Sequence, residues 1–252
     1  MKYQGLNCWG GAQELTGHSD ISEPSSKPSW ACHRSTLDHN RSVKRACDFL
    51  FAGIGLLVLF PVLIIIALLL IGSGFRNPLF LQKRVGLEGR IFVIFKFRTL
   101  RDRTCRPLSA RGLRFAETLS SILRITGLDE LPQFINVLRG DMSLVGPRPH
   151  SLADHHRFAD RIPDYATRLA IKPGMTGWAQ IQGWRGPVCS TDHLQARIAC
   201  DLEYIRRQTP LFDCTILIRT VALPIRTLTR YRAQRQLHRT LKPCLGRDRR
   251  LV

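Results

Sequence analysis

Residues 124–149 read RITGLDELPQFINVLRGDMSLVGPRP, and this stretch sets the expected fold and site of the chain. Two adjacent carboxylates, Asp129 and Glu130, precede apolar residues that recur at helical spacing: Leu131, Phe134, Ile135 and Leu138. This spacing predicts a helix with one buried face. Thr126 is a candidate N-cap, and Pro132 suits only the start of such a helix.

The two acids would then lie at the positive end of the helix dipole, where carboxylates stay ionised. Ionised, adjacent acids can bind a divalent metal ion, or one of them can attack an electrophile. The simpler alternative is that acids in a first helical turn only complement the dipole.

The predicted helix ends at Arg139-Gly140, and a strand-like piece follows over Met142 to Val145. It leads into Gly146-Pro147-Arg148-Pro149. Two prolines around one arginine hold its guanidinium in place, which suits phosphate recognition.

The composition requires a polyanionic neighbour, because the 252 residues carry a formal charge of +19. Nucleic acid, an anionic membrane surface and phosphorylated substrates are the candidates. The sequence contains no nucleic-acid-binding module, so we expect no nucleic acid as partner. Eight scattered cysteines form no C-x-x-C pair, which is typical of reduced thiols in a cytosol-facing protein.

An uncharged apolar run extends from Phe49 to Ile71 and is long enough to cross a bilayer. It could be a transmembrane helix, a buried core helix or a re-entrant hairpin. Pro61 in the middle of the run predicts a kink. Basic residues flank the run on both sides, which favours the re-entrant form with both ends in the cytoplasm: Lys44, Arg45, Arg76, Lys83 and Arg84.

The rest of the chain predicts a small α/β part that is mainly helical. Strands are expected near Asn77–Gly86 and over Arg90–Thr99, and helices over Ala116–Ile125 and Asp192–Ile205. Residues 211–228 are expected to form an amphipathic helix at the membrane interface. Four basic residues of the strands could line a phosphate site or form a solvated basic face: Lys83, Arg84, Lys96 and Arg98.

These patterns divide the chain into four parts. We expect a flexible tail over 1–42, a re-entrant membrane helix over 43–75, a catalytic domain over 76–228 and a basic tail over 229–252.

Several motifs resemble the signature of the bacterial sugar transferases, the monotopic phosphoglycosyl transferases. They are LDELPQ and NVLRGDMSLVGPRP, K-R-V-G at 83–86, K-F-R-T at 96–99, and PGMTGWAQ at 173–180. The resemblance runs from about Lys44 to about Leu228, and G-W-R-G at 183–186 resembles the branch that uses UDP-glucose. In the PGMTGWAQ motif, Trp178 and Gln180 could stack on and hydrogen-bond a base or sugar.

The resemblance implies transfer of a sugar-1-phosphate from a UDP-sugar to undecaprenyl phosphate, with release of UMP. For this reaction, our hypothesis is that Asp129 is the nucleophile, that Glu130 holds Mg²⁺ with Asp129 or orients the site, and that Arg124 and Arg148 balance phosphate charge. The resemblance also implies a re-entrant helix in the bacterial inner membrane, in contact with membrane lipid, and a catalytic part that faces the cytoplasm.

Three features depart from the family pattern. Phe60 precedes Pro61 where relatives often have a small polar residue, an acidic loop is missing from 101–109, and 187–192 lacks an acidic-threonine stretch. An alternative is therefore a non-catalytic membrane scaffold that kept the transferase fold. The sequence leaves the sugar and a homodimer open.

Overall fold

The computed structural model describes residues 38–102, 105–186, 188 and 190–222. The predicted basic tail at 229–252 and residues 1–37 of the predicted N-terminal tail lie outside these ranges. Residues 38–42 belong to the first helix, α1, which spans Asp38–Gly72.

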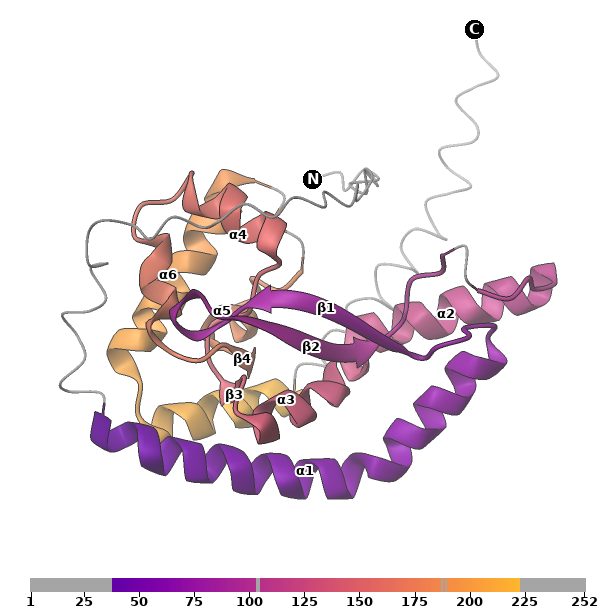
Figure 1. The fold of residues 1–252 in the computed structure, drawn as a ribbon, viewed down its shortest axis with the longest axis horizontal. Helices are drawn as coiled ribbons and strands as arrows, with labels where there is room; N and C mark the ends of the chain where they lie inside the picture. The colour runs from indigo at the N-terminus through magenta and orange to yellow at the C-terminus, as the bar shows by residue number, and fades with distance from the viewer. Residues whose placement is uncertain (1–37, 103–104, 187, 189, 223–252) are drawn as a thin grey trace, which may run out of the picture.

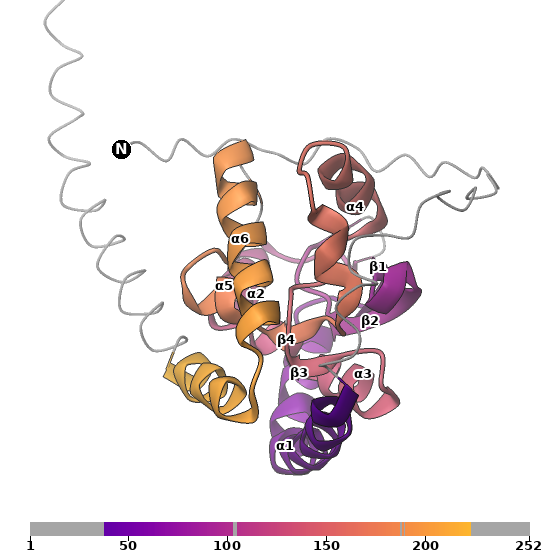
Figure 2. The same cartoon turned by 90° about the vertical axis from the view of Figure 1, so that its left-hand side faces the viewer.

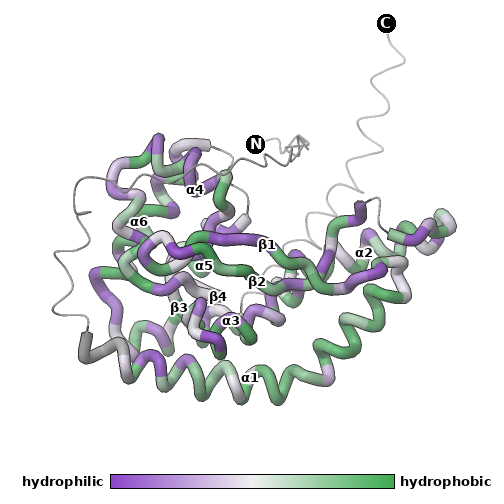
Figure 3. Tube along the Cα trace, viewed as in Figure 1, coloured by the Kyte–Doolittle hydropathy of each residue, from purple (hydrophilic) through white to green (hydrophobic). Residues whose placement is uncertain are grey.

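Helix α1 is the most apolar element of the part of the chain that the structure describes (Figure 3). Its segment Ser42–Gly72 is long and apolar enough to cross a membrane, with a hydropathy of 3.3 over its most apolar window, of which 11% is buried against the protein. Large side chains such as Leu57 and Val58 are exposed. This exposure rules out the buried core helix.

Helix α1 continues through Pro61 without a break. Figure 1 shows that it curves along one side of the molecule and that its C-terminal half rises towards β1. A proline removes one backbone hydrogen-bond donor and commonly bends a helix in this way. Whether both ends stay on one side of a membrane remains a prediction.

Strands β1 (Leu79–Val85) and β2 (Ile91–Phe97) confirm the two predicted strands. They pair antiparallel, with Leu79 opposite Phe97 and Val85 opposite Ile91. A short 3₁₀ turn, η2 (Leu87–Gly89), joins them. Helix α2 (Ala110–Thr126) begins before the predicted start at Ala116, because the Ser109 side chain caps it by accepting a hydrogen bond from the Gly112 amide.

The acid-bearing segment differs from its predicted form. The two acids lie in a 3₁₀ helix, η3 (Leu128–Gln133), and only then does α3 (Phe134–Arg139) begin. Thr126 is not an N-cap, because it ends α2 and its hydroxyl donates to the Ile122 carbonyl. Gly127 at φ +79° reverses the chain between α2 and η3, a conformation that favours glycine.

The remaining elements complete a mainly helical α/β fold. Strand β3 (Ser143–Val145) confirms the strand-like piece and pairs parallel with β4 (Gly174–Thr176). The other helices are α4 (Leu152–Ala159), η4 (Tyr165–Ala170), α5 (Trp178–Ile181) and α6 (Thr191–Arg207). Residues 210–222 are helical, and the rest of the predicted interfacial helix lies outside the described residues.

Two apolar clusters attach α1 to the rest of the protein. Ala52 of α1 packs in a core with Ile94 of β2, Val145 of β3 and Tyr204 of α6. Ile66 and Leu70, further along α1, join a second core with Phe97 and Leu123. Figures 1 and 2 both place α3 and β3 directly above α1. The apolar helix is therefore also a structural part of the folded domain.

Candidate active site

Glu130 forms a bidentate ion pair with Arg148. Arg148 Nη1 lies 3.1 Å from Glu130 Oε2, and Nη2 lies close to Oε1. Arg185 Nη2 adds a longer contact of 3.7 Å to Oε2. Burial alone would raise the pKa of Glu130, but the charge and hydrogen bonds of Arg148 lower it to about 2. Glu130 is therefore ionised under all ordinary conditions.

Asp129 has a different environment although it directly precedes Glu130 in the sequence. Its carboxyl is buried, and Oδ1 has no hydrogen-bond partner among the described residues. Burial and the negative charge of Glu130 raise the pKa of Asp129 to about 6, while Lys96, Arg185 and Arg148 oppose the rise. Two neighbouring carboxyls with separated pKa values are typical of acids with different chemical roles.

Positive charge accumulates around the two acids. Lys96 and Arg84 are partly buried, and burial together with nearby cations lowers the pKa of both groups, that of Arg84 to about 10. Arg84 Nη1 donates to the Pro149 carbonyl at 3.2 Å. Cations that are held together without water gain from an anion with several charges. The cluster therefore suits a diphosphate.

The turn at 146–149 is fixed by close backbone packing. The amides of Gly146 and Gly174 donate to the carbonyls of Thr176 and Pro147, both at 2.9 Å. A Cβ at Gly174 would overlap the backbone nitrogen of Gly146, so only glycine fits there. Pro147 and Pro149 are buried beside Arg148. The turn thus presents Arg148 to the acids on a rigid support.

A buried ion pair supports the same turn from behind. Arg168 binds Asp201 through Nε at 3.0 Å and Nη2 at 2.8 Å, and both side chains are almost fully buried. Arg168 Nη2 also donates to the Arg148 carbonyl at 2.6 Å. His150 Nδ1 lies 3.0 Å from Arg168 Nη1. Helix α6 thereby holds the backbone of the arginine that binds Glu130.

Other predicted phosphate-binding residues have partners away from the acids. Arg124 donates to the Thr99 carbonyl at 2.9 Å and joins α2 to the end of β2. Arg98 pairs with Asp102 at 2.6 Å. Gln180 Nε2 bonds the Met175 carbonyl at 3.2 Å, whereas its buried Oε1 has no partner in the described ranges. Substrate contacts by these three residues remain predictions.

The basic pair that precedes the apolar run, predicted to keep this end of the run in the cytoplasm, also contacts the protein. Lys44 forms an ion pair with Asp213. Arg45 donates to the last carbonyls of α3, those of Val137 and Leu138, at 2.6 and 2.9 Å. Cations at a helix C-terminus stabilise it.

Several important residues escaped the sequence patterns. Asn136 bonds the Val93 carbonyl and the Phe95 amide and so attaches α3 to β2. Four further residues support the site but belong to none of the sequence motifs: Arg168, Asp201, Asp48 and Tyr204. Of these residues, Asp48 had a clue in the sequence, because it is a charged residue directly before the apolar run.

The two acids offer Mg²⁺ one carboxylate oxygen without a partner among the described residues, and Mg²⁺ binding remains a prediction. No group of three or more histidine, cysteine or acidic residues forms a metal site within the described residues. Mg²⁺ commonly uses one or two carboxylates together with substrate phosphates. Asp129 offers an oxygen without a partner, while Arg148 engages both oxygens of Glu130.

A profile described as "Bacterial sugar transferase" matches residues 39–227, three quarters of the chain, including both acids and the turn at 146–149. The chain belongs to the bacterial sugar transferase family. Within this family, it is 40% identical over 209 residues to the UDP-glucose:undecaprenyl-phosphate glucose-1-phosphate transferase of Escherichia coli K12, covering 81% of this chain and 45% of that protein.

Two further relatives show how the family varies in its donor sugar. The Caulobacter vibrioides transferase with the same printed function is 43% identical over 182 residues, covering 71% of this chain and 68% of its own length. A UDP-N-acetylgalactosamine-undecaprenyl-phosphate N-acetylgalactosaminephosphotransferase of Aeromonas hydrophila is 34% identical over 186 residues, covering 71% of this chain and 43% of its own length. The chain thus spans less than half the length of the first and third relatives.

Proposed function

We propose that this sugar transferase moves a sugar-1-phosphate from a UDP-sugar, with UDP-glucose as first choice, to undecaprenyl phosphate. The observation that carries the proposal is the pair of unequal acids, with Asp129 unpaired and Glu130 held by Arg148. Both relatives named for glucose support the donor, while the N-acetylgalactosamine relative keeps a second donor class open to test.

In the first step, ionised Asp129 attacks the β-phosphorus of the UDP-sugar. A new bond forms between the carboxylate oxygen and phosphorus, the bond between phosphorus and the UMP oxygen breaks, and UMP leaves. The product is an aspartyl phosphosugar on the protein. Covalent catalysis of this kind divides one difficult transfer into two easier steps.

In the second step, an oxygen of undecaprenyl phosphate attacks the same phosphorus. The bond to Asp129 breaks, and the lipid leaves as a diphosphate-linked sugar. Arg148, Lys96 and Arg84 neutralise charge on the phosphates in both steps. Mg²⁺, held by Asp129 and Glu130 together with the phosphates, would supply further positive charge.

The proposal places the enzyme in the bacterial inner membrane, with its catalytic part in the cytoplasm, where it starts exopolysaccharide or another glycan. Helix α1 is the membrane element, re-entrant at Pro61. Basic residues before and after the apolar run support an orientation with both ends in the cytoplasm.

The test is UMP release from a panel of UDP-sugars, with Mg²⁺ and undecaprenyl phosphate in lipid nanodiscs. Wild-type protein is compared with Asp129→Asn. Asp164→Asn is the matched control, because Asp164 is exposed and its left-handed φ of +59° is one that asparagine also adopts readily. We expect activity with one donor, lost in Asp129→Asn and kept in the control.

The covalent step has its own readout. With a radiolabelled UDP-sugar and no acceptor lipid, wild-type protein should retain label and Asp129→Asn should not. UMP release that survives Asp129→Asn would remove Asp129 as nucleophile. An absence of UMP from every donor would instead favour the non-catalytic scaffold.

A further inference from the structure

Strand β3 carries the catalytic arginine on its C-terminal side. The strand is short, Ser143–Val145, and Arg148 follows within the turn at 146–149. Among the described residues, its partner strand is β4, and the first contact between them is the hydrogen bond from the Ser143 amide to the Pro173 carbonyl at 2.8 Å. Because this pair of strands is so short, its hydrogen bonds constrain the position of the turn only weakly.

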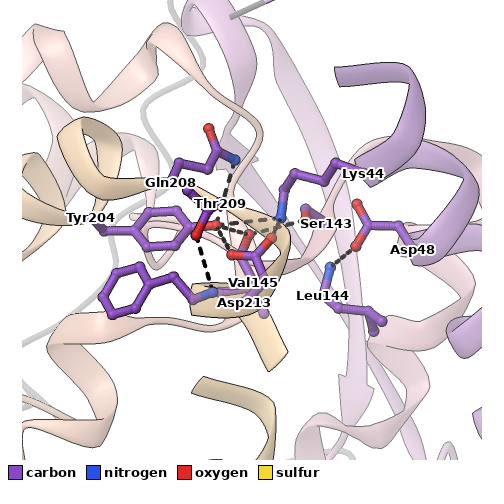
Figure 4. Close-up of polar contacts among 10 residues, drawn as sticks. Lys44, Asp48, Ser143, Leu144, Val145, Tyr204, Gln208, Thr209 and Asp213 are labelled. Carbon is purple, nitrogen blue, oxygen red and sulfur yellow. Dashed lines mark hydrogen bonds and ion pairs between the residues drawn. The ribbon is translucent and has the colours of Figure 1, made fainter. Parts of the chain in front are cut away.

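Side chains of two helices bond the β3 backbone directly (Figure 4). Asp48 of α1 accepts a hydrogen bond from the Leu144 amide at 3.0 Å, and Asp48 is 5% exposed. The hydroxyl of Tyr204 of α6 lies 3.1 Å from the Val145 carbonyl oxygen. Burial raises the pKa of Tyr204, so its hydroxyl stays protonated, and its one proton is shared between the Val145 carbonyl and Asp213 Oδ1.

Asp213 connects the same two helices to the segment at 210–222, through an ion pair with α1 and a hydrogen bond with α6. Asp213 lies 2.6 Å from the Tyr204 hydroxyl and pairs with Lys44 of α1. Lys44 Nζ is itself 3.3 Å from the Tyr204 hydroxyl. A pocket with about 490 Å³ of empty space, including open solvent, borders this network between α1 and residues 209–217. The contacts link the membrane helix to β3 through charged groups.

A buried carboxylate is costly unless it has a partner. Asp48 directly precedes the apolar run of α1, and an apolar side chain would be less costly to bury at this position. Its bond to the Leu144 amide gives a reason for a carboxylate at this position, namely to orient the strand that leads to Arg148.

We propose that Asp48 and Tyr204 are positioning residues: they clamp β3 from the membrane helix and from α6, and thereby hold Arg148 against Glu130. The inference rests on the proposed function. It extends that function by making the seating of α1 a condition for an ordered active site.

The test compares Asp48→Ala with Asp48→Asn in the full chain in lipid nanodiscs, using UDP-glucose or whichever donor releases UMP. Asparagine keeps an acceptor oxygen for the Leu144 amide, and alanine does not. We expect kcat to fall about tenfold to a hundredfold in Asp48→Ala, since small displacements of catalytic groups cost that much. The KM for the donor should change little, and Asp48→Asn should recover most of kcat.

Thermal unfolding separates positioning from loss of structure. Asp48→Ala and Tyr204→Phe should both lose kcat at temperatures well below their Tm, where each variant is still folded. The loss then reflects the position of Arg148, because each variant removes one hydrogen bond to the β3 backbone.

Ile198→Val is the matched control, because Ile198 is buried in α6 and its side chain has no polar atoms. It should lose some stability but keep the wild-type kcat. If Asp48→Ala does not fold, Tyr204→Phe, which removes one oxygen, decides the question.

Wild-type kcat in both Asp48→Ala and Tyr204→Phe would overturn the proposal. So would a loss of kcat in Asp48→Ala that asparagine does not rescue. Failure of the proposed function is distinct, because it is seen as UMP release by Asp129→Asn.

Discussion

At the scale of single residues, Asp129 and Glu130 show how neighbours in sequence acquire opposite electrostatics. Glu130 meets Arg148 in a two-pronged contact, and its pKa falls to about 2. Asp129 lacks such a partner at Oδ1, and its pKa rises to about 6. A carboxylate that is poorly compensated in the folded protein is a better nucleophile than one in a tight ion pair.

The first prediction concerns pH. In the proposed mechanism Asp129 must be ionised to attack, so kcat should rise with pH along an acid limb; the pKa of Asp129 is about 6 in the metal-free protein, and a bound cation would lower it. Lys96→Met should move this limb to higher pH, because Lys96 lowers the pKa of Asp129. UMP release measured between about pH 4.5 and 8.5 checks both statements.

Arg90→Met provides the control for that shift, because the Arg90 side chain is 81% exposed and contacts Glu88. It should leave the limb in place. An acid limb that does not respond to Lys96→Met would contradict the electrostatic account.

The second prediction concerns stability. The pKa of Asp129 is raised from 3.8 to about 6 on folding, so the folded state is favoured at low pH and this advantage is lost as pH rises through 6. At about pH 7.5, ionised Asp129 therefore costs the fold roughly 3 kcal/mol. Asp129→Asn removes this cost and should raise Tm.

The gain in Tm should shrink as pH falls towards about 4, where the wild-type carboxyl is protonated in the folded state. Thermal unfolding in nanodiscs at both pH values measures it. Glu130 has the opposite sign, since its pKa is lowered from 4.5 to about 2, so its contribution is present above 4.5 and is lost as pH falls through 2. A Tm for Asp129→Asn below that of wild type at about pH 7.5 would refute the burial cost.

At the scale of elements, α1 combines two tasks. Its exposed apolar side chains face outwards for much of its length, while Ala52, Ile66 and Leu70 pack into the two cores. The helix also curves, so that its C-terminal half rises towards β1 (Figure 1). A helix attached to the protein at both halves favours insertion from one side over a straight crossing.

The third prediction tests this topology with two native cysteines. Cys47 precedes the apolar run and is exposed, and Cys105 follows it with intermediate exposure. With the other cysteines changed to serine, a membrane-impermeant maleimide should label both residues in inside-out vesicles and neither in intact spheroplasts. The positive-inside preference gives the same expectation.

Pro61→Ala should straighten α1 and change the relative labelling of Cys47 and Cys105, whereas Phe60→Leu at the neighbouring exposed position should not. Labelling of the two cysteines from opposite sides of the wild-type membrane would establish a spanning helix in place of a re-entrant one.

At the scale of the whole molecule, buried ion pairs connect distant parts of the chain to one turn. Arg168 and Asp201 lie 33 residues apart in sequence, and Arg168 reaches the Arg148 carbonyl. Together with Asp48 and Tyr204, they hold the backbone on both sides of the turn at 146–149. The active site thus depends on the packing of several helices.

The fourth prediction removes one partner of the buried pair. Asp201→Asn leaves Arg168 without its counter-charge, which should cost about 3–5 kcal/mol of unfolding free energy. Arg157→Gln is the control, because its pair with Asp154 is about half exposed, and it should cost no more than about 1 kcal/mol. Denaturant unfolding of both variants gives the comparison.

The double variant Arg168→Met, Asp201→Leu should recover part of the stability lost in Asp201→Asn, because no buried charge remains. It should not recover activity, since the bond from Arg168 to the Arg148 carbonyl is also gone. An Asp201→Asn protein as stable as wild type would show that the pair does not bear on folding.

Local patterns in the sequence determined much of this protein. Periodicity predicted β1, β2, α2 and α6, glycine and arginine marked the end of α3, and one apolar run identified α1. The motif residues fixed the family and the acid pair. These features follow from interactions within a few residues, which the sequence displays directly.

Only the tertiary structure decided which groups surround each acid. It selected Arg148, 18 residues from Glu130 in sequence, as the partner of Glu130, added Arg185, and gave Arg124 a backbone partner instead. It also replaced the predicted helical start at Asp129 with a 3₁₀ turn, because Gly127 reverses the chain there. Burial and long-range pairing set these outcomes, and neither has a local signature in the sequence.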